Sequence, residues 1–168
     1  CSAYDQLELH NKKRQAIEAE MLLEARKRVG GKEPAIVYYS ESNHAGIQGI
    51  VASKLAEIFG KPAIMLADVE GGMVAGSGRA GQFLHLQAAF ETLDENMPGL
   101  LASFGGHKAA AGLKIHKEDI QRFSNGFCEV VQEQLKGQDI RPFKGTDGSL
   151  RGFINMDTCY QIDKLQPF

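Results

Sequence analysis

Apolar positions are sparse in the first part of the chain. Residues 2–28 contain no glycine or proline and are rich in Glu, Lys, Arg, Ala and Leu, a composition typical of helix. The apolar stripe of this helix is thin, with Leu7, Ile17 and Met21 near heptad spacing. A long helix that is mostly polar cannot be buried on all sides, and such helices often bridge two bodies. The pattern therefore predicts a connector helix, which Gly30-Gly31 ends.

From Pro34 onwards, short apolar runs alternate with helical spacings. Residues 35–39 and 62–67 are apolar runs typical of buried strands, and residues 47–59 between them carry apolar side chains at helical spacing. This order of strand, helix and strand predicts a parallel pair with a right-handed crossover. Further strands are predicted at residues 73–76 and 109–115, and further helices at residues 83–93, 97–104 and from 120 to near 137. The predicted fold class is α/β, with a mixed, largely parallel sheet flanked by helices and preceded by the long connector helix.

These patterns divide the chain into three regions. We predict a connector helix at residues 1–31, an α/β domain at residues 32–137 and a short extension, or the start of another domain, at residues 138–168. The chain opens with Cys1 directly in the helical pattern and ends at Phe168 without a polar tail. We expect both ends to be cuts through a longer protein; a removed tag or a processed start is the alternative for the first residue.

Composition and charge narrow the function classes only a little. A chain of 168 residues with 43% hydrophobic and 24% charged residues is ordinary for a globular domain. The net charge of −2 gives no global electrostatic argument for nucleic acid, although a local basic groove is compatible with it. The three scattered cysteines argue against a disulfide framework and a zinc site. No segment approaches the roughly 18 consecutive apolar residues of a membrane span, and the charged first thirty residues are unlike a signal peptide. We expect a cytoplasmic protein that binds no membrane.

The most informative segment runs from Gly105 to Gly112, with the sequence GGHKAAAG. Gly105 and Gly106 lack side chains, so a ligand can approach their backbone closely, and their amides could face an anion. His107 adds a side-chain donor directly after them. The alternative is a tight turn with a hydrogen-bonded histidine and a strand of small residues. From the residues alone, the two interpretations are equally supported.

Two further loops present a cation or donor beside glycine. The segment Gly76-Ser77-Gly78-Arg79 follows a predicted strand, and an arginine fork matches phosphate oxygens. The segment Asn43-His44-Ala45-Gly46 precedes a predicted helix, whose N-terminus favours anions. A solvated arginine and an exposed histidine in a capping loop are the simpler explanations of each segment alone. Together with His107, the three loops favour a phosphate-binding surface.

The sequence contains none of the common motifs for bond cleavage that we considered. It contains no paired-carboxylate cluster, no HxxH set and no GxSxG elbow. Its acidic residues fall mainly on predicted helix faces, where a solvated surface explains them. We therefore predict no catalytic residues and no metal site in this chain.

The sequence resembles the RecJ-type exonucleases of the DHH phosphoesterase superfamily. Residues 43–55, NHAGIQGIVASKL, are similar to that family's WHxGVxGIVASRL stretch, and residues 76–80, GSGRA, look like its GSxRS. Residues 105–112 match the GGHxxAAG signature of the DHH-associated domain. The first helix resembles the family's connecting helix, and residues 147–150 and 166–168 resemble the start of an oligonucleotide-binding-fold region. The chain departs from the family pattern at Asn43, where the family has Trp, and at Ala80, where it has Ser.

The resemblance implies a divided active site. In the family, an upstream DHH domain holds the Mn²⁺ or Mg²⁺ ions, and no DHH motif or aspartate-rich metal motif occurs in this chain. This chain would then be the nucleic-acid-binding part, with no cofactor of its own. It would grip single-stranded DNA for a 5′-to-3′ exonuclease of DNA repair and recombination, and a single-strand-binding protein would be a further partner. The phosphate contacts would come from His44, Ser77, Arg79, Gly105, Gly106 and His107.

Two other readings remain open at this point. The same grip could serve a smaller ligand in a DHH-family oligoribonuclease or cyclic-dinucleotide phosphodiesterase, because GGHxxAAG is shared with those groups. A non-catalytic α/β interaction module is the third reading, and it predicts no dependence on phosphate. The length dependence of nucleic-acid binding separates the first two.

Overall fold

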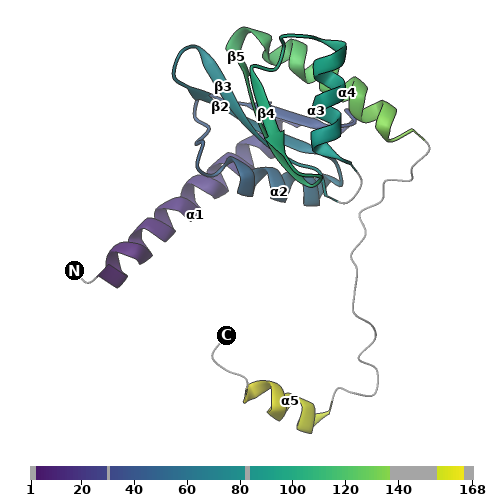
Figure 1. The fold of residues 1–168 in the computed structure, drawn as a ribbon. Helices are drawn as coiled ribbons and strands as arrows, with labels where there is room; N and C mark the ends of the chain where they lie inside the picture. The colour runs from purple at the N-terminus through teal and green to yellow at the C-terminus, as the bar shows by residue number, and fades with distance from the viewer. Residues whose placement is uncertain (1–2, 30, 82–83, 137–154, 165–168) are drawn as a thin grey trace.

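The computed structural model describes residues 3–29, 31–81, 84–136 and 155–164 (Figure 1). Along the chain the elements are α1 (Ala3–Arg28), β1 (Ile36–Tyr39), α2 (Gln48–Phe59), β2 (Ala63–Val69), β3 (Met73–Arg79), α3 (Leu86–Asn96), β4 (Ser103–Gly106), β5 (Ala110–His116), the 3₁₀ turn η1 (Lys117–Asp119), α4 (Ile120–Gln134) and α5 (Met156–Asp163). Apart from α5 and its flanking residues, the predicted extension at residues 138–168 lies outside the described residues.

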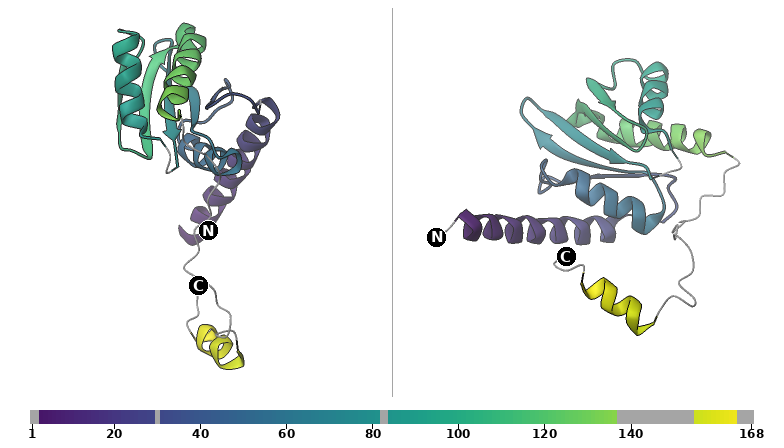
Figure 2. Two further views of the ribbon diagram at one scale, coloured as in Figure 1. Left: turned by 90° about the vertical axis from the view of Figure 1, so that its right-hand side faces the viewer. Right: turned by 60° about the horizontal axis from the view of Figure 1, so that its bottom comes forward.

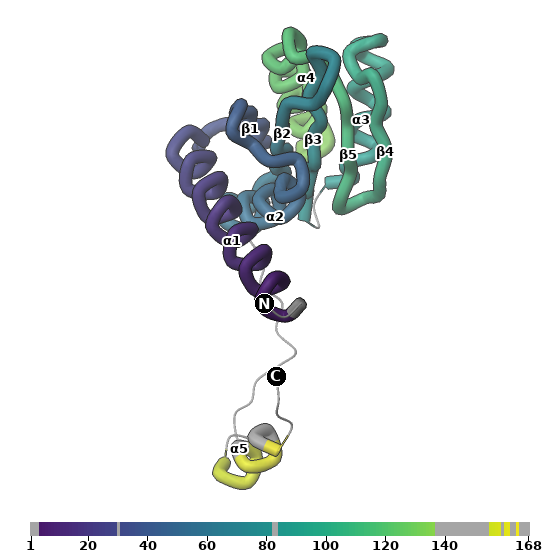
Figure 3. Tube along the Cα trace, turned by 90° about the vertical axis from the view of Figure 1, so that its left-hand side faces the viewer, coloured from purple at the N-terminus to yellow at the C-terminus, as the bar shows by residue number. Residues whose placement is uncertain are grey.

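The strands form one five-stranded sheet in the order β1-β2-β3-β5-β4, which Figure 3 shows side by side. Only β1 and β2 pair in parallel, as their crossover through α2 predicts, and the other three pairs are antiparallel. The expectation of a largely parallel sheet was therefore wrong. Gly71 and Gly72, at φ +79° and +70°, turn the chain directly from β2 into β3, and a hairpin pairs its strands antiparallel. A second tight turn joins β4 to β5 in the same way.

The helix expected at residues 97–104 was also wrong. Helix α3 is capped at Met97, and Gly99 then adopts φ +81°, which is incompatible with continued helix. The chain resumes as β4, whose Phe104 packs edge-on against Phe90 with ring centroids 6.3 Å apart. The pairing of that aromatic ring with α3 explains why this segment joins the sheet.

Helices cover the two faces of the sheet unequally (Figures 1 and 2). On one face, α3 and α4 pack over a core that includes the stacked rings of Phe123 and Phe127. On the other face, α1 and α2 bury a second, smaller core against β1 and β2. Along β5, the side chains toward α3 and α4 are buried, whereas Gly112, Lys114 and His116 are exposed. Part of the sheet on the α2 side is therefore open to solvent.

Helix α1 confirms the long N-terminal helix that the sequence predicts. Its second half packs on α2, where Met21 and Ala25 are buried. Its first turns extend beyond the α/β body (Figure 2). The side chains of Tyr4 and Leu7 there are about 70% exposed. Among the described helices, none combines the length and the apolar character needed to cross a membrane.

Candidate nucleic-acid interface

Arg79 ends β3 on the sheet face toward α2. Its Nη1 donates to Ser77 Oγ at 3.1 Å and to the carbonyl oxygen of Gly78 at 2.7 Å. Within the described part of the chain, no carboxylate forms an ion pair with this guanidinium. Arginine has five N–H donors and is always charged. An oriented, half-buried arginine without a carboxylate partner suits an anionic ligand.

Gly49, in the first turn of α2, lets Arg79 lie against that helix. A Cβ at Gly49 would stand 2.6 Å from Arg79 Nη2 and 3.2 Å from Ser77 Oγ. A glycine inside a helix normally costs about 1 kcal/mol relative to alanine, so the close approach of Arg79 explains its presence. The sequence reasoning missed Gly49 as a site residue, and this unfavourable glycine was the available signal.

Gln48, beside it, was missed as well. Its side chain is buried at 3% exposure, and Nε2 donates to the carbonyl oxygen of Ala75 at 3.0 Å. This hydrogen bond ties the start of α2 to β3. The helix start therefore has a fixed position relative to Ser77 and Arg79, which lie on the same strand.

A groove of about 620 Å³ lies between one side of α2, with the loop before it, and the end of β3. It is lined by Ala45, Gly46, Gly49, Ile50, Ser53, Lys54, Glu57, Ser77 and Arg79. The N-cap residue Ile47 provides no side-chain hydrogen bond to the helix start. Backbone amides at an uncapped helix N-terminus attract anions. The groove thus brings together two cations, Arg79 and Lys54, one carboxylate, Glu57, and a serine hydroxyl beside the helix start.

An open strip of glycine backbone continues from this groove across the sheet. Ser77 is opposite Gly112 on β5, and Gly112 is opposite Gly105 on β4, so the three residues share one sheet face. A Cβ at Gly105 would meet nothing within 4 Å, and one at Gly112 would meet only the carbonyl oxygen of Gly76 at 3.6 Å. We call Gly112 and Gly105 the glycine strip. Packing does not require glycine at either position.

Gly106 and His107 form the turn between β4 and β5. Gly106 has φ +150°, and a Cβ there would stand 2.5 Å from the carbonyl oxygen of Ala110, so the turn itself requires glycine. The backbone N–H of His107 donates to that same carbonyl at 2.8 Å. The His107 side chain is exposed, and none of the described residues hydrogen-bonds its imidazole. The tight-turn interpretation therefore accounts for Gly106 but leaves the histidine side chain unexplained.

The turn and the end of β3 meet at one corner of the sheet. The N–H of Ala80 donates to the carbonyl oxygen of Ala109 at 3.1 Å, and Arg79 is opposite Ala110 in the strand register. The structure thus brings His107 to the same end of the sheet as Arg79. Residues far apart in the sequence contribute donors to one region.

His44 lies in the loop before α2 but outside the groove lining. Its side chain is exposed, and its carbonyl oxygen accepts from the N–H of Ile47 at 3.0 Å. The neighbouring Ala45 and Gly46 line the groove instead. Asn43 fixes the loop, since its Nδ2 donates to the carbonyl oxygen of Leu66 at 2.7 Å. Among the predicted site residues, His44 therefore has the weakest structural support, because its side chain does not line the groove.

Lys117, a cation at the opposite end of β5, is already paired. Its Nζ lies 3.2 Å from Glu41 Oε1 and 3.1 Å from Asp68 Oδ2. Contacts with the Tyr39 hydroxyl, and then with the Asp68 and Glu41 carboxylates, raise the pKa of Lys117 above its usual range. Two carboxylates therefore balance the charge of this ammonium, in contrast to Arg79.

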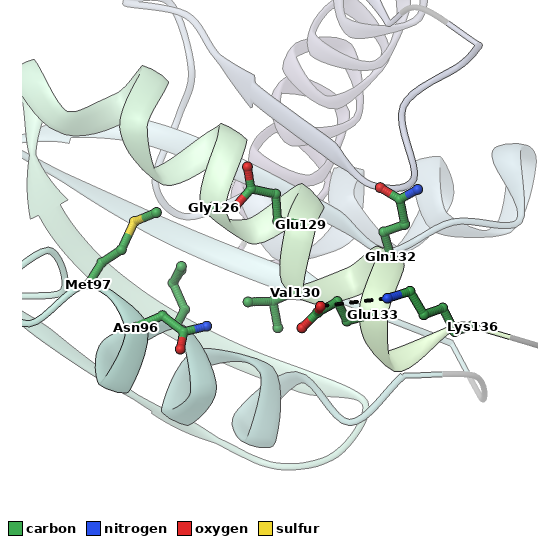
Figure 4. Close-up of a pocket in the computed structure, with 9 residues that line it drawn as sticks. Asn96, Met97, Gly126, Glu129, Val130, Gln132, Glu133 and Lys136 are labelled. Carbon is green, nitrogen blue, oxygen red and sulfur yellow. Dashed lines mark ion pairs between the residues drawn. The ribbon is translucent and has the colours of Figure 1, made fainter.

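A second pocket, of about 440 Å³, lies between α3 and α4 (Figure 4). Leu93 and Val130 give it an apolar part, and Glu129, Glu133 and Lys136 surround it with charge. Lys136 pairs with Glu133 at 3.7 Å. Two carboxylates and one ammonium line this pocket, whereas two cations and one carboxylate line the groove, so this pocket is the poorer site for phosphate. Across the described ranges, no group of three or more His, Cys, Asp or Glu side chains could hold a metal ion.

Comparisons with known proteins point to one group. The DHHA1 domain model matches residues 32–133. The single-stranded-DNA-specific exonuclease RecJ of Escherichia coli is 37% identical over 135 residues, which cover 80% of this chain and 23% of that protein. The enzyme of the same name from Bacillus subtilis is 35% identical over 164 residues, covering 94% and 20%. The crystal structure of Thermus thermophilus RecJ with Mg²⁺ superposes with a TM-score of 0.68 at 26% identity, covering 77% and 20%. This chain thus spans about a fifth to a quarter of these relatives.

Proposed function

Because this chain belongs to the DHHA1 domain family and is related to RecJ exonucleases, we propose that it is the strand-binding part of a RecJ-like enzyme. In this proposal the parent protein is a metal-dependent 5′-to-3′ exonuclease of DNA repair and recombination. The chain grips single-stranded DNA through phosphates, while another domain of the parent hydrolyses the phosphodiester bond. Residues 1–31 link the two parts.

The proposal rests on one observation, which is the set of contacts that the Arg79 guanidinium makes. Its guanidinium is oriented by Ser77, lies against the uncapped start of α2 and pairs with no carboxylate of the described residues. A forked cation beside a helix N-terminus that has no side-chain cap is suited to phosphate oxygens.

The glycine strip gives the strand a path away from this phosphate. Ser77, Gly112 and Gly105 lie on three neighbouring strands, so they span about 10 Å at the usual strand spacing. That length is about the rise of three stacked nucleotides. Without side chains along the strip, the sugar-phosphate backbone can lie close to the peptide backbone. His107, in the turn at the same end of the sheet as Arg79, adds a further donor.

In this proposal, another domain of the parent protein binds the metal ions. RecJ structures have been determined with Mg²⁺ and with Mn²⁺, but the described side chains of this chain include no cluster that fits either ion. Two-metal hydrolysis needs ions that activate water and stabilise the leaving oxygen. We therefore expect the purified chain to release no nucleotides from single-stranded DNA with added Mn²⁺ or Mg²⁺. Release at the rate of a full-length relative would contradict this division of labour.

The test of the binding role is the salt dependence of affinity. For single strands, each neutralised phosphate contributes roughly −0.7 to the slope of log affinity against log salt. Two or three contacts predict a shallow slope of about −1.5 to −2 for this chain with an oligothymidylate. Arg79→Ala should remove about one contact and reduce the slope by roughly 0.7.

Arg122→Ala is the matched control for that experiment. Arg122 lies on α4, is 55% exposed and pairs with Asp119 at 3.8 Å. Its loss changes the net charge by the same amount but removes no predicted phosphate contact, so the slope should stay at the wild-type value. If Arg79→Ala and Arg122→Ala give the same affinity throughout the salt series, the phosphate grip is wrong. Comparing oligothymidylates of increasing length with a cyclic dinucleotide separates a strand-binding site from one for a small ligand.

A further inference from the structure

Glu18 is a buried carboxylate on the face of α1 that packs against α2. It is 7% exposed, and the residues one turn further along this face are the buried Met21 and the half-buried Leu22. Its ion-pair partner is Nζ of Lys54 on α2. Burying a carboxylate is unfavourable unless it is paired, and an apolar side chain would fill such a position at less cost. The packing of the two helices therefore does not explain why glutamate stands here.

Lys54 connects this pair to the groove. Its side chain is 49% exposed and lines the groove together with Ser77 and Arg79. An ammonium has three donors, and one contact with Glu18 leaves others free for a second anion. A free lysine on a helix surface samples many rotamers, and fixing it costs entropy when a ligand binds. Pairing with Glu18 restricts the ammonium to the side of the groove before any ligand arrives.

We infer that Lys54 is a further phosphate-binding residue of the groove and that Glu18 is its positioning residue. This inference rests on the proposed function, because it assigns a second cation to the same phosphate site. It also links the first helix to the groove, through the contact between α1 and α2. Lys54 is held at the groove only while α1 lies on α2, so the placement of the connector helix affects the strand-binding site.

Whether Glu18→Leu raises or lowers the affinity for an oligothymidylate separates this inference from a simple charge effect. Glu18→Leu removes a negative charge next to the groove, and electrostatics alone predicts tighter binding of an oligothymidylate. If Glu18 positions Lys54, the same variant binds more weakly, by roughly threefold for a half-exposed cation. Lys54→Met should weaken binding similarly and reduce the salt slope by about 0.7. The double variant should bind like Lys54→Met alone, because each change removes the same contact.

Glu8→Leu is the matched control. Glu8 lies on the exposed part of α1 and pairs with Lys12 at 2.9 Å, so its loss changes the net charge equally but far from the groove. We expect Glu8→Leu to bind the oligothymidylate as tightly as wild type or slightly more tightly. Binding of Glu18→Leu that equals or exceeds that of Glu8→Leu overturns the positioning role.

A charge swap covers the case in which Glu18→Leu does not fold. The double variant Glu18→Lys with Lys54→Glu keeps the ion pair between α1 and α2 but removes the cation from α2. It should melt near wild type and bind at least as weakly as Lys54→Met, because it also places a carboxylate in the groove, and wild-type binding by the swap would contradict the inference. If Arg79→Ala weakens binding while Lys54→Met does not, the result supports the phosphate groove and contradicts the role of Lys54. If Arg79→Ala is neutral as well, the proposed function falls with it.

Discussion

Glycines occur on both sides of the sheet for opposite reasons. On the side of α3 and α4, a Cβ at Gly76 would stand 2.8 Å from Leu66 Cδ2, and one at Gly126 would stand 2.8 Å from Leu93 Cδ1. On the open side, Gly105 has nothing within 4 Å and Gly112 has one contact at 3.6 Å. Packing explains the first pair and does not explain the second. A strand glycine with room for a side chain therefore indicates a surface that something else approaches closely.

The sharpest test of this comparison uses Gly105 and Gly106, the two adjacent glycines at the end of β4. Gly106→Ala places a Cβ 2.5 Å from backbone atoms at φ +150°, and such strain should destabilise the fold by about 3 kcal/mol. Gly105→Ala meets no atom, and its effect should stay within about 0.5 kcal/mol. Urea unfolding of both variants measures the difference. Equal stabilities would show that the two glycines do not differ as the geometry indicates.

The next largest effect concerns His107. A hydrogen bond to a charged group is worth about 1.5–3 kcal/mol, so His107→Ala should weaken binding of an oligothymidylate roughly tenfold to a hundredfold. The melting temperature should stay at the wild-type value, because the exposed imidazole has no hydrogen bond to the described residues. The tight-turn interpretation predicts the reverse, a lower melting temperature with unchanged binding. Both quantities can be measured on the same sample.

Filling the glycine strip should affect binding but not stability. Gly105→Val adds a β-branched side chain in open space, and valine is favoured in strands, so stability should be unchanged or slightly higher. The added bulk keeps a sugar-phosphate backbone away from the strip, and binding should weaken about tenfold if one charge-assisted hydrogen bond is lost. Fluorescence anisotropy with an oligothymidylate measures the affinity. Wild-type affinity would mean that the strip is not on the path of the strand.

Gly49→Ala should give the smallest effect, with opposite signs for stability and binding. Alanine favours helix over glycine by about 1 kcal/mol, so the melting temperature should rise if Arg79 can move aside. The new Cβ would displace a guanidinium that stands 2.6 Å away, and affinity should fall about threefold, as for a partly exposed charge contact. The variant Gly49→Ala with Arg79→Ala should bind like Arg79→Ala alone. Additive losses would show that Gly49 acts through some other residue.

The elements that the sequence predicted correctly are those with a strong local pattern. The strand at Ile36–Tyr39 and the helix at Gln48–Phe59 stand out as an apolar run and a helical spacing. The small residues that end β3 and make up β4 carry no such pattern, so β3 was predicted too short and β4 was predicted as helix. Pairing direction between distant strands is set by tertiary contacts, which explains why the parallel character was overestimated.

The candidate site shows a similar division. Ser77, Arg79 and His107 stood out because they combine a donor with glycine-rich segments, and the structure brings them to one end of the sheet. Gly49 and Lys54 were not predicted as site residues, because they line a groove only when β3 lies beside α2. A single sequence places a residue on a helix face but does not give its neighbour across the groove.

The lengths of the strands have a consequence for self-association. The two strands at the edges of the sheet, β1 and β4, have four residues each, whereas the three inner strands have seven. Unpaired edge strands are templates on which other chains can add, and short edges offer few backbone groups for that addition. Glycine in half of β4 weakens its β propensity further. A sheet with an open, uncharged strip can thus stay exposed with little tendency toward edge-to-edge aggregation.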